Sequence, residues 1–162
     1  MSEQGSLAPV KKSVAVRANV QDAFDAFTKG FDGWWPRSHH IGSSPMVRAV
    51  IETALNGRCY SLQEDGSECP WGTVTAWDPP HRFVFAWQIT PDWKYQPDLA
   101  TSSEVEVRFT AEADGRTRVD LEHRHFGRMG ASGAAMRAGV DTPQGWNGLL
   151  SLFVSFAEQE TA

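Results

Sequence analysis

The C-terminal part of the chain carries its clearest pattern of apolar and polar positions. Apolar side chains recur there at helical spacing, over Trp146, Leu149, Leu150, Phe153, Phe156 and Ala157. This spacing places them on one face of an α-helix and leaves Ser155 on the polar face. Asp141 or Thr142 can cap such a helix, and Pro143 suits its first turn. We therefore expect an amphipathic helix over residues 141–159.

The N-terminal part of the chain alternates with a period of two instead. Apolar Val10, Val14 and Val16 are separated by polar side chains, which predicts an edge strand over residues 10–18. Helical spacing follows at Val20, Ala23, Phe24 and Phe27, and then a short apolar turn runs from Phe31 to Trp35 until Pro36 ends it. Two short helices are therefore expected after the first strand.

A run of six strands is expected between these ends. They lie at about residues 47–53, 58–63, 69–77 and 82–90, and around Val105–Phe109 and Val119–His123. Asn56-Gly57 indicates a hairpin between the first two, and Asp78-Pro79-Pro80 indicates a rigid corner. The faces of the strand over residues 69–77 stay unassigned, because its odd and even positions both hold apolar or aromatic side chains.

The register of the last two strands follows from which positions face inward. Val105 and Phe109 share the parity of Val119 and His123, and a two-residue turn would pair each inward side chain with an outward one. A three-residue loop, Ala113-Asp114-Gly115, restores the match and places Gly115 in the left-handed position of a bulged turn.

This register also pairs the charged side chains on the outer face. It sets Arg108 opposite Asp120 and Glu104 opposite Arg124. It also sets Glu106 opposite Glu122, a like-charge pair that we expect solvent to screen.

The order of elements predicts an α+β fold. A curved antiparallel sheet of about seven strands would surround the long C-terminal helix, with two short helices after the first strand. Residues 1–8 offer nothing to bury and are expected to be a disordered lead-in. Residues 9–160 are the size of one domain.

Composition and charge narrow the function classes. The formal net charge of −5 argues against a nucleic-acid surface, and no stretch has the roughly 18 apolar residues of a membrane span. The N-terminus lacks the apolar core of a signal peptide, so we expect a cytoplasmic protein with Cys59 and Cys69 reduced. Seven Trp and nine Phe indicate either an aromatic core or a pocket lined with rings.

Several local strings resemble those of a known family. The early ones are Phe31-Asp32-Gly33-Trp34-Trp35-Pro36, Trp71-Gly72-Thr73-Val74, Asp78-Pro79-Pro80 and Arg82-Phe83-Val84-Phe85-Ala86-Trp87. The late ones are Leu121-Glu122-His123 and Gly145-Trp146-Asn147-Gly148-Leu149-Leu150. Over residues 10–159 the chain resembles the family of homologues of the activator of heat-shock-protein-90 ATPase. That family belongs to the START-like superfamily, also called SRPBCC.

The resemblance implies a helix-grip fold with a deep apolar cavity between the sheet and the terminal helix. Relatives bind lipids, sterols or polyketides, and some catalyse aromatisation or ring hydroxylation. The eukaryotic co-chaperone has a second, N-terminal domain that contributes to chaperone binding, and this sequence has no segment long enough to form it. We expect a single START-like domain.

Eight residues are the candidates for ligand binding in this cavity. They are Trp35, Tyr60, Phe85, Trp87, Val107, His123, Trp146 and Leu150. His123 shares the inward parity of its strand, so it either completes a buried hydrogen-bond network or acts as an acid–base group. Trp87 is either core or cavity wall. The aromatic residues Trp34, Trp35, Trp93 and Tyr95 would form a lid or a partner surface if exposed, and would cap the core if buried.

No other motif indicates a particular chemistry. His39-His40 and His123-x-His125 could supply imidazoles to a metal, but adjacent loop histidines usually point apart, so we expect no metal and no cofactor. We expect Arg37 and Arg48 to be solvated rather than to meet a ligand carboxylate.

Three functions remain open from the sequence. The first is a non-enzymatic domain that binds a small hydrophobic or aromatic molecule in an internal cavity. The second is an enzyme acting on a polyketide-like or aromatic substrate, with His123 as its acid–base group. The third is a chaperone-interacting or dimerisation module, either monomeric or a homodimer.

Overall fold

The computed structural model describes residues 8–39, 44–90, 92 and 94–160. The strands are β1 (Val10–Val16), β2 (Met46–Ile51), β3 (Arg58–Gln63), β4 (Glu68–Asp78), β5 (Arg82–Trp87), β6 (Ser103–Ala111) and β7 (Thr117–Arg124). The α-helices are α2 (Val20–Phe27), α3 (Phe31–Trp34), α4 (Gly133–Val140) and α5 (Trp146–Glu160). Short 3₁₀ segments lie at Leu99–Thr101, Ala113–Gly115 and Phe126–Ser132.

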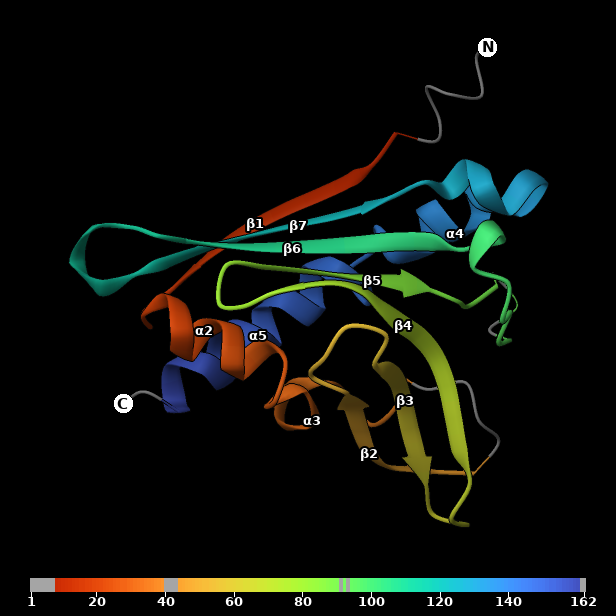
Figure 1. Ribbon diagram of the computed structural model, residues 1–162, viewed down its shortest axis with the longest axis horizontal. Helices are drawn as coiled ribbons and strands as arrows, with labels where there is room; N and C mark the ends of the chain where they lie inside the picture. Colours follow the sequence, from red (N-terminus) through yellow and green to blue (C-terminus); the bar gives the residue numbers. More distant parts are fainter. Residues whose placement is uncertain (1–7, 40–43, 91, 93, 161–162) are drawn as a thin grey trace.

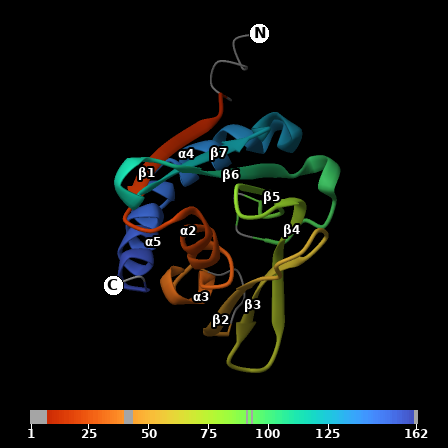
Figure 2. The same ribbon diagram turned by 60° about the vertical axis from the view of Figure 1, so that its left-hand side comes forward.

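The seven strands form one antiparallel sheet in the order β1-β7-β6-β5-β4-β3-β2. The sheet curls, and α2, α3 and α5 lie on its concave side (Figures 1 and 2). This arrangement confirms the predicted α+β helix-grip fold. Because β1 pairs with β7, the first strand of the chain lies beside the last.

Helix α2 packs on the concave side of the sheet, against α5 and β6. It begins where expected, because the Asn19 side chain accepts a hydrogen bond from the backbone N–H of Asp22 at 2.8 Å. Phe24 and Phe27 then make edge-on ring contacts with Phe83 of β5 and Phe109 of β6. These contacts place the aromatic core between α2 and the middle of the sheet.

Helix α5 carries the predicted apolar stripe, and its buried side chains include Trp146, Leu150 and Phe153. Its start is later than predicted, at Trp146 instead of residue 141 or 142. The preceding residues form a tight turn in which Thr142 accepts from the N–H of Gly145. A side chain at Gly145 would collide with the carbonyl oxygen of Val140, so this turn depends on glycine.

The β6–β7 hairpin has the predicted register. Val105 pairs with His123 and Phe109 with Val119, and the connecting loop holds Gly115 at φ +73°. The expectation about Glu106 was wrong, however. Glu106 does face Glu122, but it is only 2% exposed, so protein groups and not solvent neutralise it.

Three arginines provide that neutralisation on the outer face of the sheet. Arg124 donates to the Glu106 carboxylate at 2.6 Å and Arg108 at 2.9 Å, and Arg82 completes the cluster. Burial by itself would raise the pKa of the Glu106 carboxyl, but the hydrogen bonds outweigh it and lower the pKa to about 2.

Strand β4 has two bulges, which explain why its faces could not be assigned. The pairing shifts by one residue at Trp71 against β3 and again at Thr75 against β5. Each extra residue reverses the alternation, so Trp71 and Trp77 lie on the same side of the sheet as Val74. The first bulge thereby turns the indole of Trp71 toward the concave side.

Candidate functional site

A pocket of about 410 Å³ lies beside the first turn of α5. Its lining comes from the segment after α3, from β4 and β5, and from the stretch that joins α4 to α5. The lining residues are Trp35, Ser38, His39, Trp71, Trp87, Ile89, Gly139, Val140, Gln144, Gly145, Trp146 and Leu149. This volume is within the range of small-molecule sites, roughly 300–1,000 Å³.

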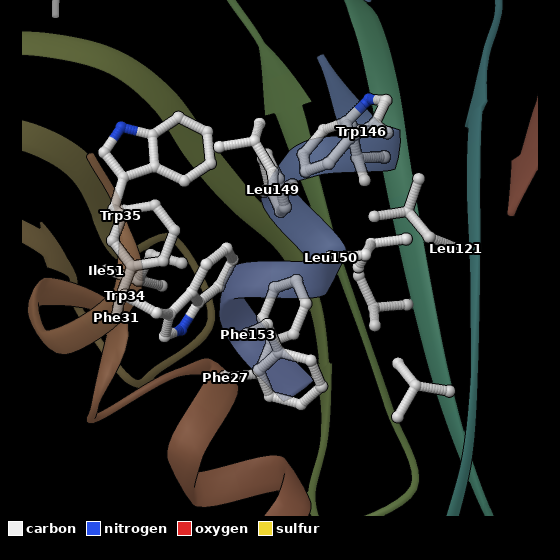
Figure 3. Close-up of a cluster of buried hydrophobic side chains, with 14 of the residues drawn as sticks. Phe27, Phe31, Trp34, Trp35, Ile51, Leu121, Trp146, Leu149, Leu150 and Phe153 are labelled. Atoms are coloured by element: carbon white, nitrogen blue, oxygen red, sulfur yellow. The ribbon is translucent and has the colours of Figure 1, made fainter. Parts of the chain in front are cut away.

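Four indoles form the walls of the pocket. Trp35 and Trp71 stack nearly parallel, with ring centroids 5.8 Å apart and an interplanar angle of 7°. Trp87 meets both Trp71 and Trp146 edge-on, at 5.7 Å and 5.8 Å. Figure 3 shows Trp35 and Trp146 at one end of the buried cluster, with Leu149 of α5 between them in the view. Flat rings on several sides favour a ligand that is itself flat and apolar.

The polar edge of the pocket is made by Ser38, His39 and Gln144. His39 Nε2 lies 2.9 Å from the carbonyl oxygen of Gln144. A carbonyl oxygen only accepts, so Nε2 carries the proton, and Ser38 Oγ can donate to Nδ1 of a neutral imidazole at 3.1 Å. This bond joins the segment after α3 to the stretch before α5 across the pocket.

His123 lies behind this wall and is not part of the lining. Trp146 Nε1 donates to His123 Nδ1 at 3.1 Å, so the proton of the neutral imidazole is on Nε2, where it is donated to Ser103 Oγ at 2.8 Å. Burial lowers the pKa of His123 to about 3. His123 is thus a neutral imidazole with both nitrogens engaged, and its partner Trp146 is held in place by it.

A comparison with protein families identifies the chain. The family described as "Activator of Hsp90 ATPase homolog 1-like protein" matches residues 17–158. The chain belongs to this family. Among functionally curated proteins, no match is found.

Solved structures with the same fold include two that share about a third of the sequence. The anthrahydroquino-gamma-pyrone synthase Txn09 is 35% identical, with a TM-score of 0.64 and coverage of 92% of this chain and 96% of that one. The self-sacrificing resistance protein CalC from Micromonospora echinospora is 32% identical, with a TM-score of 0.69 and coverage of 96% and 97%. Protein NE0264 from Nitrosomonas europaea has a TM-score of 0.66 at 13% identity and covers 96% of this chain and 97% of its own, which shows the shared fold.

Three of the predicted ligand-binding residues, Trp35, Trp87 and Trp146, line the pocket of this family member. Phe85, Val107 and Leu150 are buried in the core and are not in the lining, and neither is His123. Tyr60 lies on β3 under the guanidinium of Arg58, at 4.4 Å, also outside the lining.

The sequence analysis did not place Trp71, Ile89 and His39 in the site. Trp71 faces the pocket because of the first bulge in β4. The ambiguous alternation of that strand in the sequence was the signal for a bulge. Ile89 has the same parity as Trp87, so the alternation of the predicted strand over residues 82–90 could have placed it on the same face. His39 was considered only as a metal ligand.

The remaining aromatic and metal candidates have clear positions where the structure describes them. Trp34 and Trp35 are buried and cap the core, whereas Tyr95 is 41% exposed. Trp93 and His40 lie outside the described residues. Within the described ranges, no three His, Cys, Asp or Glu side chains gather as a metal site, and no helix there is long and apolar enough to cross a membrane.

Proposed function

We propose that this protein binds a small, flat, hydrophobic molecule in the pocket beside α5. The four indoles of Trp35, Trp71, Trp87 and Trp146 carry the proposal, because together they offer ring faces and ring edges around one volume. The polar edge at His39 and Gln144 gives such a ligand an orientation, as a few polar groups do in most small-molecule sites.

The name of one relative, Txn09, supports an aromatic ligand, whereas the name of CalC gives no ligand. Txn09 is named as a synthase of an anthrahydroquino-gamma-pyrone, a fused-ring compound, and CalC is named as a resistance protein. Both cover nearly the whole chain at more than 30% identity. An aromatic polyketide is therefore the ligand class that we propose for this pocket.

A titration with three ligand classes tests the proposal. Tryptophan fluorescence is followed while a fatty acid, a sterol or a tricyclic quinone is added. We expect the quinone to bind in the micromolar range and the other two to bind more weakly, because only the quinone matches the indole walls. The absence of binding by all three, in a protein that unfolds cooperatively, would rule the proposal out.

Two tryptophans of β4 provide a matched pair of variants. Trp71 lines the pocket, whereas Trp77 contacts Phe24 and Phe83 away from it. Trp71→Leu should lower quinone affinity about tenfold or more, since fully burying a large side chain contributes about 1.5–3 kcal/mol. Trp77→Leu should leave affinity within about twofold while lowering stability. Equal affinity losses in the two variants would argue against binding at this pocket.

An enzymatic function is the second candidate, because Txn09 is named as a synthase. For this candidate function, the acid–base group that we propose is His39 instead of His123. His123 is fully buried and lies outside the lining, whereas His39 is one of the lining residues and its hydrogen bonds are at the exposed edge of the pocket. Incubation of a polyketide substrate with wild type and with His39→Phe tests this candidate, and turnover that survives the substitution would exclude His39.

The hypothesis of an interaction module rests on fewer exposed aromatic side chains than the sequence suggested. Trp34 and Trp35 are buried and so cannot form an exposed partner surface, which leaves Tyr95 among those of the four aromatic residues that the structure describes. Chaperone binding, a cytoplasmic location and the monomeric or homodimeric state stay proposals. Light scattering gives the mass, and a pull-down with the chaperone gives the contact.

A further inference from the structure

The indole N–H of Trp87 has no hydrogen-bond acceptor among the described residues, although Trp87 is 4% exposed and its Nε1 is shielded from solvent. Two other indoles of the pocket wall do have hydrogen-bond acceptors. Trp35 Nε1 donates to the His39 carbonyl oxygen at 2.9 Å, and Trp146 Nε1 donates to His123 at 3.1 Å. Buried indole N–H groups usually find a partner, so the free donor of Trp87 calls for an explanation.

The nearest polar ring cannot supply that partner. The His123 ring lies 5.2 Å from the ring of Trp87. Its Nδ1 already accepts from Trp146, and its Nε2 carries the proton that goes to Ser103. Both nitrogens are therefore occupied, and His123 has no lone pair left to accept from Trp87.

The position of Trp87 links this free donor to the pocket. Its side chain is part of the pocket wall, and it also borders a smaller hollow of about 240 Å³ lined partly by Gln88, Ser102 and Met129. Its described contacts are ring contacts, so no hydrogen bond fixes the orientation of the indole. Because Nε1 is shielded from solvent, its N–H reaches a ligand in the pocket only if the indole turns, and among the described residues no hydrogen bond opposes that turn.

We propose that the indole N–H of Trp87 donates a hydrogen bond to an oxygen of the bound molecule. The ligand class is then a fused ring system that carries a carbonyl or ring oxygen, rather than a plain hydrocarbon or an alkyl chain. This inference rests on the proposed function, because it assigns one contact within the same pocket.

The chemistry favours an oxygen at this point for two reasons. The donor of Trp87 is already removed from water in the free protein, so the ligand does not have to strip water from it. A ligand without an acceptor would leave the donor unpaired, whereas one with an acceptor gains a bond that the free protein lacks. The pocket therefore discriminates between rings of the same shape by their oxygen atoms.

A matched pair of ligands tests the inference by calorimetric titration. Anthraquinone-2-sulfonate and anthracene-2-sulfonate have the same three-ring outline and charge, but only the first carries carbonyl oxygens. Wild type should prefer the quinone by about two- to tenfold, the usual range for one neutral hydrogen bond. Trp87→Phe should bind both ligands about equally, because it keeps a ring and loses the donor.

Trp71→Phe is the control variant, since it replaces another indole of the same wall with a smaller ring. This variant should lower the affinity for both ligands by a similar factor and keep the preference for the quinone. The indole N–H signal of Trp87, assigned by its absence from the Trp87→Phe spectrum, should move downfield in the proton NMR spectrum when the quinone binds and should move less with the hydrocarbon.

The outcomes separate this inference from the proposed function. If neither ligand binds wild type, the proposed function is wrong. If both bind but Trp87→Phe keeps the quinone preference, or the Trp87 signal does not move, the pocket binds rings and Trp87 is not the donor.

Discussion

Trp146 is the residue at which the pocket and the buried core meet. Its indole is 1% exposed, faces Trp87 at 5.8 Å and Trp35 at 6.2 Å, and donates to His123. The same side chain therefore forms part of the pocket wall and fixes the neutral imidazole behind it.

Replacing Trp146 with Ala should be strongly destabilising. The loss of a buried tryptophan costs about 3–5 kcal/mol, and here the His123 acceptor also loses its donor. Ser155→Ala is the control, because Ser155 is exposed on the polar face of α5 and its change should stay within about 0.5 kcal/mol. Chemical denaturation measures both variants. A Trp146→Ala protein with wild-type stability and wild-type binding would contradict the packing described here.

Glu106 should make folding sensitive to acid. Its folded pKa of about 2 lies below the ordinary 4.5, so the carboxylate contributes stability that is fully present above pH 4.5 and is lost as the pH falls toward 2. Up to about 3 kcal/mol of the free energy of unfolding should disappear over that interval. Glu106→Gln should be less stable at pH 7 and should lose less stability on acidification.

Urea titrations at several pH values between 2 and 7 measure this difference. Glu112→Gln is a suitable control, since Glu112 is an exposed glutamate outside the cluster. Parallel pH profiles for wild type and Glu106→Gln would show that the three arginines do not lower the pKa of Glu106.

At the scale of elements, the start of α5 depends on glycine as much as on its apolar stripe. A Cβ at Gly148 would collide with the carbonyl oxygen of Pro143, whereas a Cβ at Gly139 in α4 would meet nothing within 4 Å. The turn over residues 141–145 can therefore fold closely against the first turn of α5 and shape one side of the pocket.

Replacement of glycine by alanine should have opposite effects on stability at these two positions. Gly148→Ala should be destabilising by about 1–3 kcal/mol, because the collision outweighs the better helix propensity of alanine. Gly139→Ala should be stabilising by up to about 1 kcal/mol, since only the propensity changes. Thermal unfolding of both variants gives the comparison. A Gly148→Ala protein that melts above wild type would mean that the turn before α5 is looser than described.

How far the sequence predicts an element depends on whether its pattern is local. The stripe of α5 and the pairing of Val105 with His123 could be predicted, because burial repeats along one element or across one hairpin. Trp71 could not be placed, because two bulges reverse the alternation of β4 and their positions depend on the neighbouring strands.

The site was less predictable than the fold. Trp35, Trp87 and Trp146 were expected in it, but whether rings leave a space between them depends on how several elements pack together. The burial of Glu106 was missed for a similar reason. Its like-charged partner Glu122 is visible in the register, whereas the arginine of β5 joins the cluster only when a third strand is in place.

At the scale of the whole molecule, β1 completes the sheet. It covers β7 along its full length from Val10 to Val16, and both of these residues are at most 2% exposed. Removing β1 would expose the backbone edge of β7 next to the buried side chains of Val119 and Leu121.

Two truncations test this dependence. Deletion of residues 1–16 should abolish cooperative unfolding or cause aggregation, because it removes one strand and leaves an apolar edge. Deletion of residues 1–7 should leave the melting temperature within about 2 °C, as expected if these residues form the predicted lead-in. Circular dichroism on heating distinguishes the two. A cooperative transition in the longer deletion would show that β7 can serve as a sheet edge.

The pairing of β1 with β7 also determines when the sheet can be completed during synthesis of the chain. About a hundred residues separate Val16 from its partner Thr117. At the usual ribosomal speed of about 5–20 residues per second, the first strand emerges roughly 5–20 s before the strand that it pairs with. Throughout that interval β1 has no native neighbour, and Lys11 and Lys12 are the charges that discourage it from pairing with other nascent chains.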